Sequence, residues 1–271
     1  MTPERTAVAA ADGTPLTLHS WVREPAHAAV FYVHGIQSHA GWLGRTGPEL
    51  ARRGVRLYAL DRRGSGVSGG PRGHLPSADT VLDDYLRALA RVRELAGDLP
   101  LTAVGQSLGG SVLTALLARR SDLFDAVVWC APALGQQRLR HSAATLDRLR
   151  AGRGEQTVPV NLDDGDYTDQ ARELAFMAAD PLMLRRVTES TRAVQVELED
   201  RYMARPGLGL AAPAYLARPR HDPIIDLETA STVLRERVPG LSTEVFDTDR
   251  HYLEFTSARD SYLDWLTEAA S

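Results

Sequence analysis

The sequence predicts an α/β protein in which a mostly parallel central sheet is flanked by helices, with one helical insertion. Two observations lead to this fold class. Short apolar strands alternate with helical patterns along most of the 271 residues, which is typical of parallel sheets covered on both faces. Between about residues 134 and 210 the alternation stops and only helical stretches follow, which indicates an insertion over one edge of the sheet.

The first elements are three strands and a weak helix. Residues 5–23 contain two strand patterns joined by Asp12-Gly13, a hairpin signal. The run AAVFYV from Ala28 is wholly apolar, as in a strand buried on both faces. Residues 41–53 are weakly helical and end at Gly54.

The next elements repeat the strand and helix alternation. VRLYALD from Val55 is a strand, and a helix capped by Ser77 or Asp79 runs to Gly97 with apolar residues at helical spacing. LTAVGQ from Leu101 is a strand, residues 108–120 form a helix, and the run ending in AVVWC is the sixth strand.

The pattern returns after the insertion. PAYLAR from Pro213 is a strand, a helix begins near Asp226, STEVFD from Ser242 is a strand, and a final helix ends near Ala269. We therefore expect a core domain formed by residues 1–133 and 211–271, and a helical cap formed by residues 134–210 after the sixth strand.

Composition excludes several classes of protein. A net charge of −4 without a basic stripe argues against nucleic-acid binding. The N-terminus has no long apolar run, so we expect neither a secretory signal nor membrane insertion. We therefore expect a cytoplasmic protein. All 31 basic residues are arginine, which excludes Schiff-base and Ser–Lys chemistry. The single cysteine, Cys130, lies in an apolar run and is expected to be buried.

Ser107 is the candidate nucleophile. It lies in GQSLG, a G-x-S-x-G motif with a strand before it and a helix after it, as a nucleophile elbow requires. There the hydroxyl projects above the sheet and the amide of Leu108 points into the same space. The alternative is a serine that only caps the helix, which would need no partners elsewhere.

A second serine motif lacks this context. Ser68 also lies in a G-x-S-x-G pattern, but Pro71 follows and no helix begins until Ser77, so Ser68 is a loop residue. The same loop matches G-x-G-x-x-G. No helix begins within it, which argues against dinucleotide binding.

His251 is the candidate base. A triad on this fold runs serine, acid, histidine along the chain, and only His141, His221 and His251 follow Ser107. His251 lies in the loop after the last strand, at the sheet edge that holds Ser107. The alternative is an exposed loop histidine.

Asp222 is the candidate acid, because it follows the strand before the last one. Asp226 better fits the N-cap of the next helix, and Asp247 and Asp249 lie on the loop of His251 itself and are expected to be solvated. The neighbouring His221 has no ligand cluster around it, so we expect no metal site.

The amide of Ile36 is the second candidate oxyanion donor, beside that of Leu108. It follows His34-Gly35 at the end of the first wholly apolar strand. We expect the His34 side chain to be structural.

With these residues in place, the chain resembles the α/β-hydrolase superfamily over nearly its whole length, specifically serine hydrolases like monoacylglycerol lipase and lysophospholipase. HGIQSHAGW, LDRRGSGVSGGPRGH, GQSLGG and DPLMLRR carry the resemblance. It implies a helical cap over an apolar pocket, triad roles for Ser107, Asp222 and His251, and no cofactor. Phe176 and Met177 in the cap, with Gln37 in the loop after His34, are the expected substrate-binding residues.

We therefore expect a serine hydrolase that cleaves a small to medium ester or thioester through an acyl-enzyme. The insertion is polar and arginine-rich for a lipase lid, which favours soluble substrates. Acyl transfer by the same triad and a repurposed or non-catalytic hydrolase fold are the alternatives. The oligomeric state and the identity of the acyl group stay open.

Overall fold

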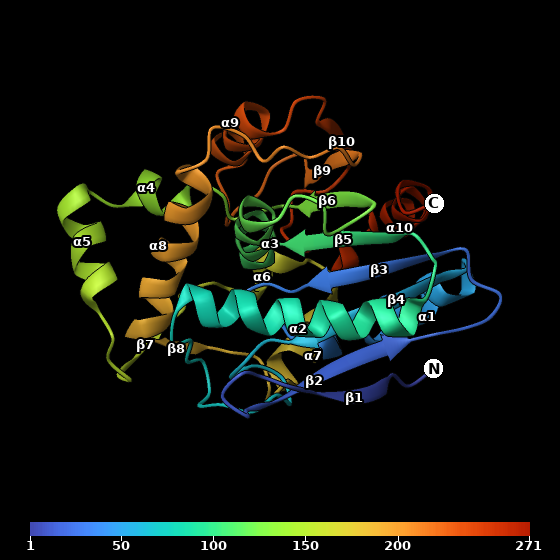
Figure 1. Ribbon diagram of the computed structural model, residues 1–271, viewed down its shortest axis with the longest axis horizontal. Coiled ribbons are helices and arrows are strands. Elements are labelled where there is room, and N and C mark those ends of the chain that lie inside the picture. The colour runs from blue at the N-terminus through green and yellow to red at the C-terminus, as the bar shows by residue number, and fades with distance from the viewer.

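An eight-stranded sheet organises the computed structural model, which describes residues 1–271 (Figure 1). Its strand order is β1-β2-β4-β3-β5-β6-β9-β10. β2 is antiparallel to both neighbours and the remaining pairs are parallel, so the predicted α/β class is confirmed. The strands are β1 (Glu4–Ala9), β2 (Pro15–Trp21), β3 (Ala28–Val33), β4 (Val55–Asp61), β5 (Leu101–Gln106), β6 (Ala126–Cys130), β9 (Ala214–Pro219) and β10 (Ser242–Phe246).

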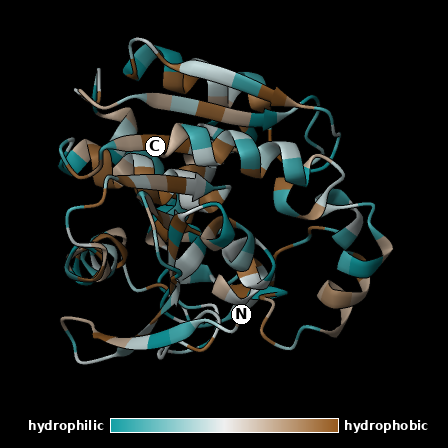
Figure 2. Cartoon of the chain, turned by 90° about the vertical axis from the view of Figure 1, so that its right-hand side faces the viewer, coloured by the Kyte–Doolittle hydropathy of each residue, from teal (hydrophilic) through white to brown (hydrophobic).

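Helices cover both faces of this sheet. Alternate residues of β3 point to opposite sides, so Phe31 joins a large apolar core and Tyr32 a smaller one. The larger core includes α2 (Ala78–Ala96), α3 (Leu108–Arg119) and α9 (Leu227–Arg237), and the smaller one includes α1 (Thr46–Arg52) and α10 (Arg259–Ala269). Figure 2 shows hydrophobic and hydrophilic residues interspersed along the helices, as expected for helices with one face on a sheet.

Turn and cap residues set the element boundaries as the sequence predicts. Gly13 turns the first hairpin with a φ of 81°. The Ser77 side chain accepts from the amide of Thr80 at 3.1 Å and begins α2, which ends at Gly97.

The weak helix expected over residues 41–53 is instead a short 3-10 helix, η1 (Ala40–Gly44), followed by α1. The glycines in this stretch weaken a continuous helix, and the His39 ring accepts from the amide of Gly41 at 3.1 Å, which starts the tight turn.

The chain between β6 and β9, residues 131–213, is mostly helical. Figure 1 shows α4, α5 and α8 beyond the ends of the β3 and β5 arrows, the side where the carboxyl ends of the parallel strands lie. A two-stranded antiparallel ribbon, which the sequence did not predict, joins these helices. Each of its strands has only three residues, too few for a periodic pattern. The elements are α4 (Gln136–Arg140), α5 (Ala143–Ala151), β7 (Thr157–Pro159), α6 (Asp164–Tyr167), α7 (Ala171–Ala179), β8 (Arg186–Thr188) and α8 (Glu189–Met203).

Buried polar contacts fasten this β6–β9 segment to the loop after β3. The Asp180 carboxylate accepts from His39 Nε2 and Trp42 Nε1, each at 2.9 Å. The amide of Leu184 donates to the carbonyl oxygen of Gln37 at 3.0 Å. These bonds hold the segment close to the ends of β3 and β5.

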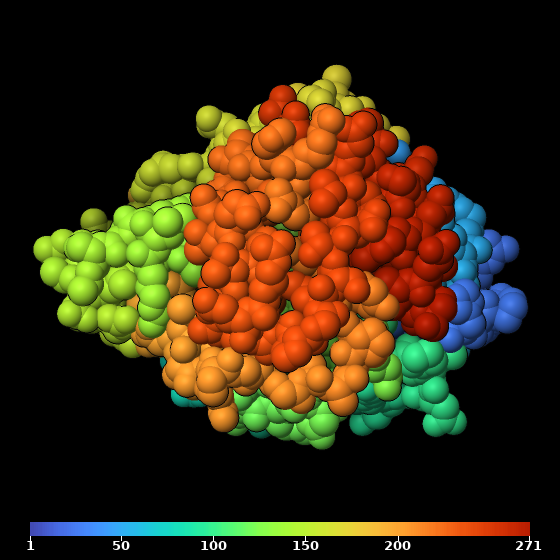
Figure 3. Space-filling view, turned by 90° about the horizontal axis from the view of Figure 1, so that it is seen from above, coloured from blue at the N-terminus to red at the C-terminus, as the bar shows by residue number.

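Figure 3 shows how the segments of the chain are distributed over one face of the molecule. Seen from above, the orange and red residues of the C-terminal third fill the middle of the molecule, and green residues of the β6–β9 segment project at one end (Figure 3). The blue N-terminal residues lie at the opposite end. No helix is both long and apolar enough to cross a bilayer.

Candidate active site

Ser107 lies at the sharp turn between β5 and α3. Its φ of 53° and ψ of −119° place a residue with a side chain in the left-handed region, which is energetically unfavourable. Hydrogen bonds to the surrounding backbone hold Ser107 in this conformation. The Ser107 amide donates to the carbonyl oxygen of Cys130 at 3.1 Å, and the Ser107 carbonyl accepts from the amides of Gly110 and Ala133, each at 2.9 Å. The neighbouring strand therefore determines the conformation of the serine.

Two glycines of the motif are required by close packing. A Cβ at Gly105 would lie 2.9 Å from the carbonyl oxygen of Gly109, and one at Gly109 would overlap the carbonyl oxygen of Val33. A side chain at either position would push α3 away from the sheet. The glycines thus allow the helix N-terminus to approach the strands where Ser107 lies.

Asp222 and His251 form a fully buried pair. Asp222 follows β9 and His251 lies in the loop between β10 and η2 (Leu253–Phe255), and Nδ1 of the imidazole is 2.7 Å from Oδ2 of the carboxylate. Oδ1 of Asp222 accepts from the amides of Ile224 and Ile225, at 2.8 and 2.9 Å. Burial opposes ionisation, but His251 and these two amides together hold the pKa of Asp222 below its usual value. The carboxylate is therefore ionised at neutral pH.

The other imidazole nitrogen of His251 faces Gln106, the residue before Ser107. Its Nε2 lies 3.2 Å from Nε2 of the Gln106 amide. Because Nδ1 donates to Asp222, Nε2 is the acceptor and the Gln106 amide donates to it. In this structure the acceptor nitrogen thus bonds to Gln106 and not to the Ser107 hydroxyl.

The β6–β9 segment covers the His251 loop. The amide of His251 donates to the carbonyl oxygen of Asp166 at 3.0 Å. The amide of Tyr252 donates to the carbonyl oxygen of Tyr167 at 3.2 Å. The Tyr167 ring meets the imidazole edge to face, with 5.6 Å between ring centroids. α6 therefore shields the imidazole from solvent.

The buried Arg62 orients the peptide units around Ile36, a role that the sequence did not reveal. Its guanidinium donates to the carbonyl oxygens of His34, Gly35 and Ile36 at 3.1 to 3.2 Å. In a trans peptide the N–H points opposite to the carbonyl, so the Ile36 amide points away from Arg62. The Arg-Arg pair after Asp61 was the only sequence signal, and it did not indicate which arginine contacts this loop.

His34 has a structural role, as expected. Its Nε2 accepts from the backbone amide of Arg62 at 3.0 Å, and its Nδ1 donates to the carbonyl of Gly35 at 2.9 Å. Burial lowers the pKa of His34 well below its usual value, so the ring is neutral.

A small cavity of about 70 Å³ contains Ser107 together with Ile36 and Leu108, the two candidate oxyanion donors. Its remaining lining residues are partly apolar and partly polar: Ala133, Gln136, Gln137, Arg140, Val160, Leu162, Arg192, Gln195, Ile224 and Ile225. The structure therefore brings the candidate nucleophile and the two residues whose amides are the candidate oxyanion donors to one space.

The three expected substrate-binding residues do not line this cavity. Gln37 is buried and its Oε1 accepts from the hydroxyl of Tyr167 at 2.7 Å. Met177 is fully buried in the core, and Phe176, 39% exposed, packs edge-on against Trp42. Phe176 and Met177 lie on α7, which packs beside Trp42, and the bond from Tyr167 holds the Gln37 side chain.

The competing acids lie where the sequence predicts. Asp226 caps α9 by accepting from the amide of Thr229 at 2.7 Å. Asp247 and Asp249 are exposed. His221 is also exposed and pairs with Asp249 at 3.0 Å.

Ser68 is a loop residue with a structural role. Its hydroxyl donates to the carbonyl of Asp61 at 2.5 Å and accepts from the amide of Thr17 at 2.8 Å. One bond joins the loop back to the end of β4, and the other joins it to β2.

The sheet order and the strand–serine–helix turn define an α/β hydrolase. The family model described as "Serine aminopeptidase, S33" matches residues 24–255, and the chain therefore belongs to this family of α/β hydrolases. The monoacylglycerol lipase of Mycolicibacterium smegmatis is 28% identical over 234 residues, 80% of this chain and 81% of that protein.

Solved structures have the same fold. The Paleococcus ferrophilus monoacylglycerol lipase superposes with a TM-score of 0.76 at 21% identity, covering 99% of this chain and 100% of that one. A soluble variant of the Saccharomyces cerevisiae monoglyceride lipase superposes with a TM-score of 0.81 at 15% identity, covering 99% and 94%. The chain is a monoacylglycerol lipase-like α/β hydrolase and a carboxylic ester hydrolase.

Proposed function

We propose that the protein cleaves a small to medium carboxylic ester, or a thioester, through a triad of Ser107, His251 and Asp222. The observation that carries this proposal is the fully buried contact of 2.7 Å between Asp222 and His251, beside a serine held in a left-handed conformation. A buried carboxylate on Nδ1 fixes the tautomer in which Nε2 accepts a proton.

The reaction begins at Ser107. His251 Nε2 exchanges the Gln106 amide for the Ser107 hydroxyl and removes its proton as the oxygen attacks the ester carbonyl. The amides of Ile36 and Leu108 donate to the oxyanion that forms. His251 then protonates the leaving alcohol or thiol, and Asp222 stabilises the imidazolium.

Water completes the turnover. It enters after the leaving group departs, gives a proton to His251 and attacks the acyl-enzyme, which releases the acid and restores Ser107.

Residues 134–210 act as the cap over a core of residues 1–133 and 211–271. The bonds of Asp180 to His39 and Trp42 support the position of this cap on the core, because they fasten the two together.

Covalent labelling tests the nucleophile. A fluorophosphonate probe should label the wild-type protein, and Ser107→Ala should neither react with it nor hydrolyse nitrophenyl butyrate. Ser68→Ala is the matched control, because it removes a hydroxyl from the other G-x-S-x-G motif and should still be labelled. A labelled Ser107→Ala protein, or an unlabelled Ser68→Ala protein that remains folded, would contradict the proposal.

A further inference from the structure

Two cavities adjoin next to Ser107. The small one that contains the serine shares Gln137, Arg140 and Arg192 with a larger one of about 630 Å³. The larger cavity lies within the β6–β9 segment and is lined by residues of α4, α5, α8 and the β7 strand. A molecule bound at Ser107 can therefore extend past the two arginines into the larger space.

The arginines that line the larger cavity have no acidic partner. Arg192 donates to the carbonyl of Pro159 at 3.0 Å, Arg148 to the hydroxyl of Thr145 at 3.0 Å, and Arg140 to the carbonyl of Ile224 and the Gln136 amide oxygen. None of the three forms an ion pair with a carboxylate, and Glu189 is the only acidic residue in the lining. The cavity thus carries an excess of positive charge.

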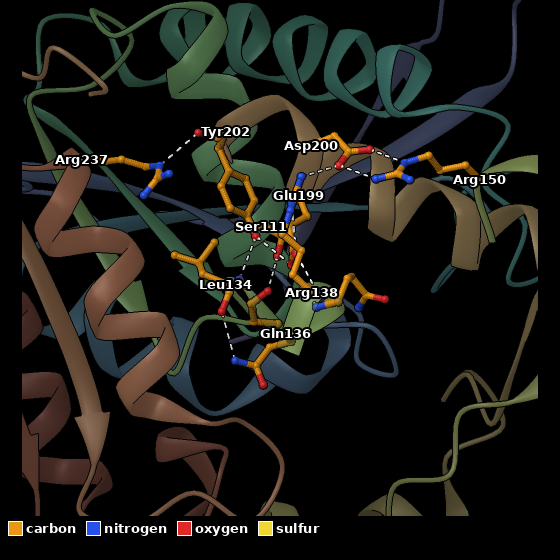
Figure 4. Close-up of polar contacts among 12 residues, drawn as sticks. Ser111, Leu134, Gln136, Arg138, Arg150, Glu199, Asp200, Tyr202 and Arg237 are labelled. Carbon is orange, nitrogen blue, oxygen red and sulfur yellow. Dashed lines mark hydrogen bonds and ion pairs between the residues drawn. The ribbon is translucent and has the colours of Figure 1, made fainter. Parts of the chain in front are cut away.

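Two neighbouring arginines that do not line the cavity, Arg138 and Arg150, are paired with carboxylates. Arg138 contacts Glu199 and Asp200, and Arg150 contacts Asp200 at 2.7 Å (Figure 4). Arg148 and Arg150 lie on the same helix, α5, yet only Arg150 has carboxylate partners. On α5, the arginine that lines the cavity thus lacks an acidic partner, whereas the one outside the lining has two.

Arg192 forms no ion pair and lies close to a second cation, Arg140. It is half-buried, and burial together with the nearby charge of Arg140 lowers its pKa. Two guanidinium groups that repel each other at a partly desolvated site favour an anion between them, because guanidinium forks bind carboxylate or phosphate oxygens.

We propose that Arg140 and Arg192 bind a phosphate or carboxylate group on the leaving-group side of the substrate, with Arg148 at the rim. This inference rests on the proposed function, since it names the substrate class of the same site. The small, partly apolar cavity at Ser107 takes a short acyl chain, and the larger cationic cavity takes an anionic alcohol or thiol. Hydrolysis then consumes one water and releases the short acid and the anionic alcohol.

Matched esters test this proposal. We compare butyrylglycerol with butyrylglycerol phosphate and with the butyryl ester of glycolate, which carries a carboxylate. The wild-type protein should show a kcat/KM at least about tenfold higher for one or both anionic esters than for the neutral one. High salt should reduce this preference, because the arginines are only partly buried.

Variants assign the preference to the cavity. In Arg140→Gln/Arg192→Gln the ratio of kcat/KM for anionic and neutral esters should fall about tenfold or more. Arg150→Gln is the matched control on α5 and should leave the ratio unchanged. A ratio near one in the wild-type protein, or a ratio that the double substitution does not change, would overturn the inference while ester hydrolysis itself stands.

Binding separates this inference from the proposed mechanism. Calorimetric titration of the wild-type protein with glycerol phosphate, and with glycerol as the neutral reference, needs no turnover. Binding of glycerol phosphate that is lost in the double variant supports the anion site even if neither ester is hydrolysed. Equal or absent binding of both compounds would count against the site, whatever the outcome of fluorophosphonate labelling.

Discussion

Nη2 of Arg62 donates to the carbonyl oxygen of Ile36 at 3.2 Å, and this contact fixes the direction of the peptide units next to Ser107. The same guanidinium also contacts the carbonyls of His34 and Gly35. A single buried cation therefore orients the loop whose Ile36 amide is proposed to bind the oxyanion. Arg62 is thus a positioning residue, since it does not line the Ser107 cavity.

The first prediction concerns this loop. Arg62→Lys should lower kcat about tenfold to a hundredfold with a smaller change in KM, because an ammonium cannot bond three carbonyls in the same geometry. Steady-state kinetics on nitrophenyl butyrate measure it. Arg63→Lys is the matched control, because Arg63 is also buried but pairs with Asp84 and Asp12, away from the loop. Equal losses of kcat in two folded variants would refute the positioning role.

The second prediction concerns the proposed triad acid. Asp222→Asn should lower kcat by a factor on the order of 10⁴, because the imidazole loses its charged partner and its preferred tautomer. Asp226→Asn is the matched control four residues away and should retain most activity, because asparagine also caps helices. The two variants are compared on the same ester. Similar losses at both positions would mean that Asp222 has no special role.

Much of the fold was predictable because it depends on local patterns. Wholly apolar strands, the Ser77 cap and the Gly97 end of α2 are visible in short stretches of sequence, and the structure confirms them. Chain order and strand ends were enough to choose Asp222 and His251, which the structure brings into contact. Their catalytic roles stay predictions.

The remaining features depend on contacts between distant residues. Whether Met177 faces Ser107 or the core is decided by where α7 packs, and no local pattern records that position. The ribbon of β7 and β8 is too short to show a period. Which arginines find carboxylate partners depends on the packing of α4, α5 and α8, so the contrast between Arg148 and Arg150 is a property of the tertiary structure.

The third prediction concerns acid stability. Asp61 accepts from His19 Nε2 at 3.0 Å and from the amides of Ala40 and Val67, at 2.7 and 2.8 Å. Burial opposes ionisation, but these contacts lower its pKa to about 2. A lowered carboxyl pKa stabilises the fold above the ordinary aspartate pKa, and the contribution is lost as pH falls toward the lowered value.

The free energy of unfolding measures this effect. Asp61→Asn should be destabilised relative to wild type by about 2 kcal/mol near neutral pH, and the difference should shrink as pH falls from about 4 to about 2. Urea titrations over that range test it. Asp98→Asn, at an exposed aspartate, is the control and should show no such convergence. A difference between wild type and Asp61→Asn that is independent of pH would contradict the linkage.

The last prediction concerns substrate length. The cavity at Ser107 is only about 70 Å³, and Arg140 and Arg192 lie in its lining, so a long acyl chain has no apolar channel to enter. The value of kcat/KM along a series of nitrophenyl esters should be highest for acetate to butyrate and fall toward laurate. It should show no jump when the ester forms micelles, because the β6–β9 segment carries many charged residues on its surface.

A widened cavity provides the matched test of this limit. Leu162→Ala removes a side chain from the lining and should move the preferred ester toward longer chains, whereas Leu182→Ala, in the same segment but outside the lining, should not. A steady rise to laurate with a jump at micelle formation would instead indicate a lipase active on aggregated lipid. That result would require the β6–β9 segment to move away from Ser107, against the bonds of Asp180 to His39 and Trp42 that hold it in place.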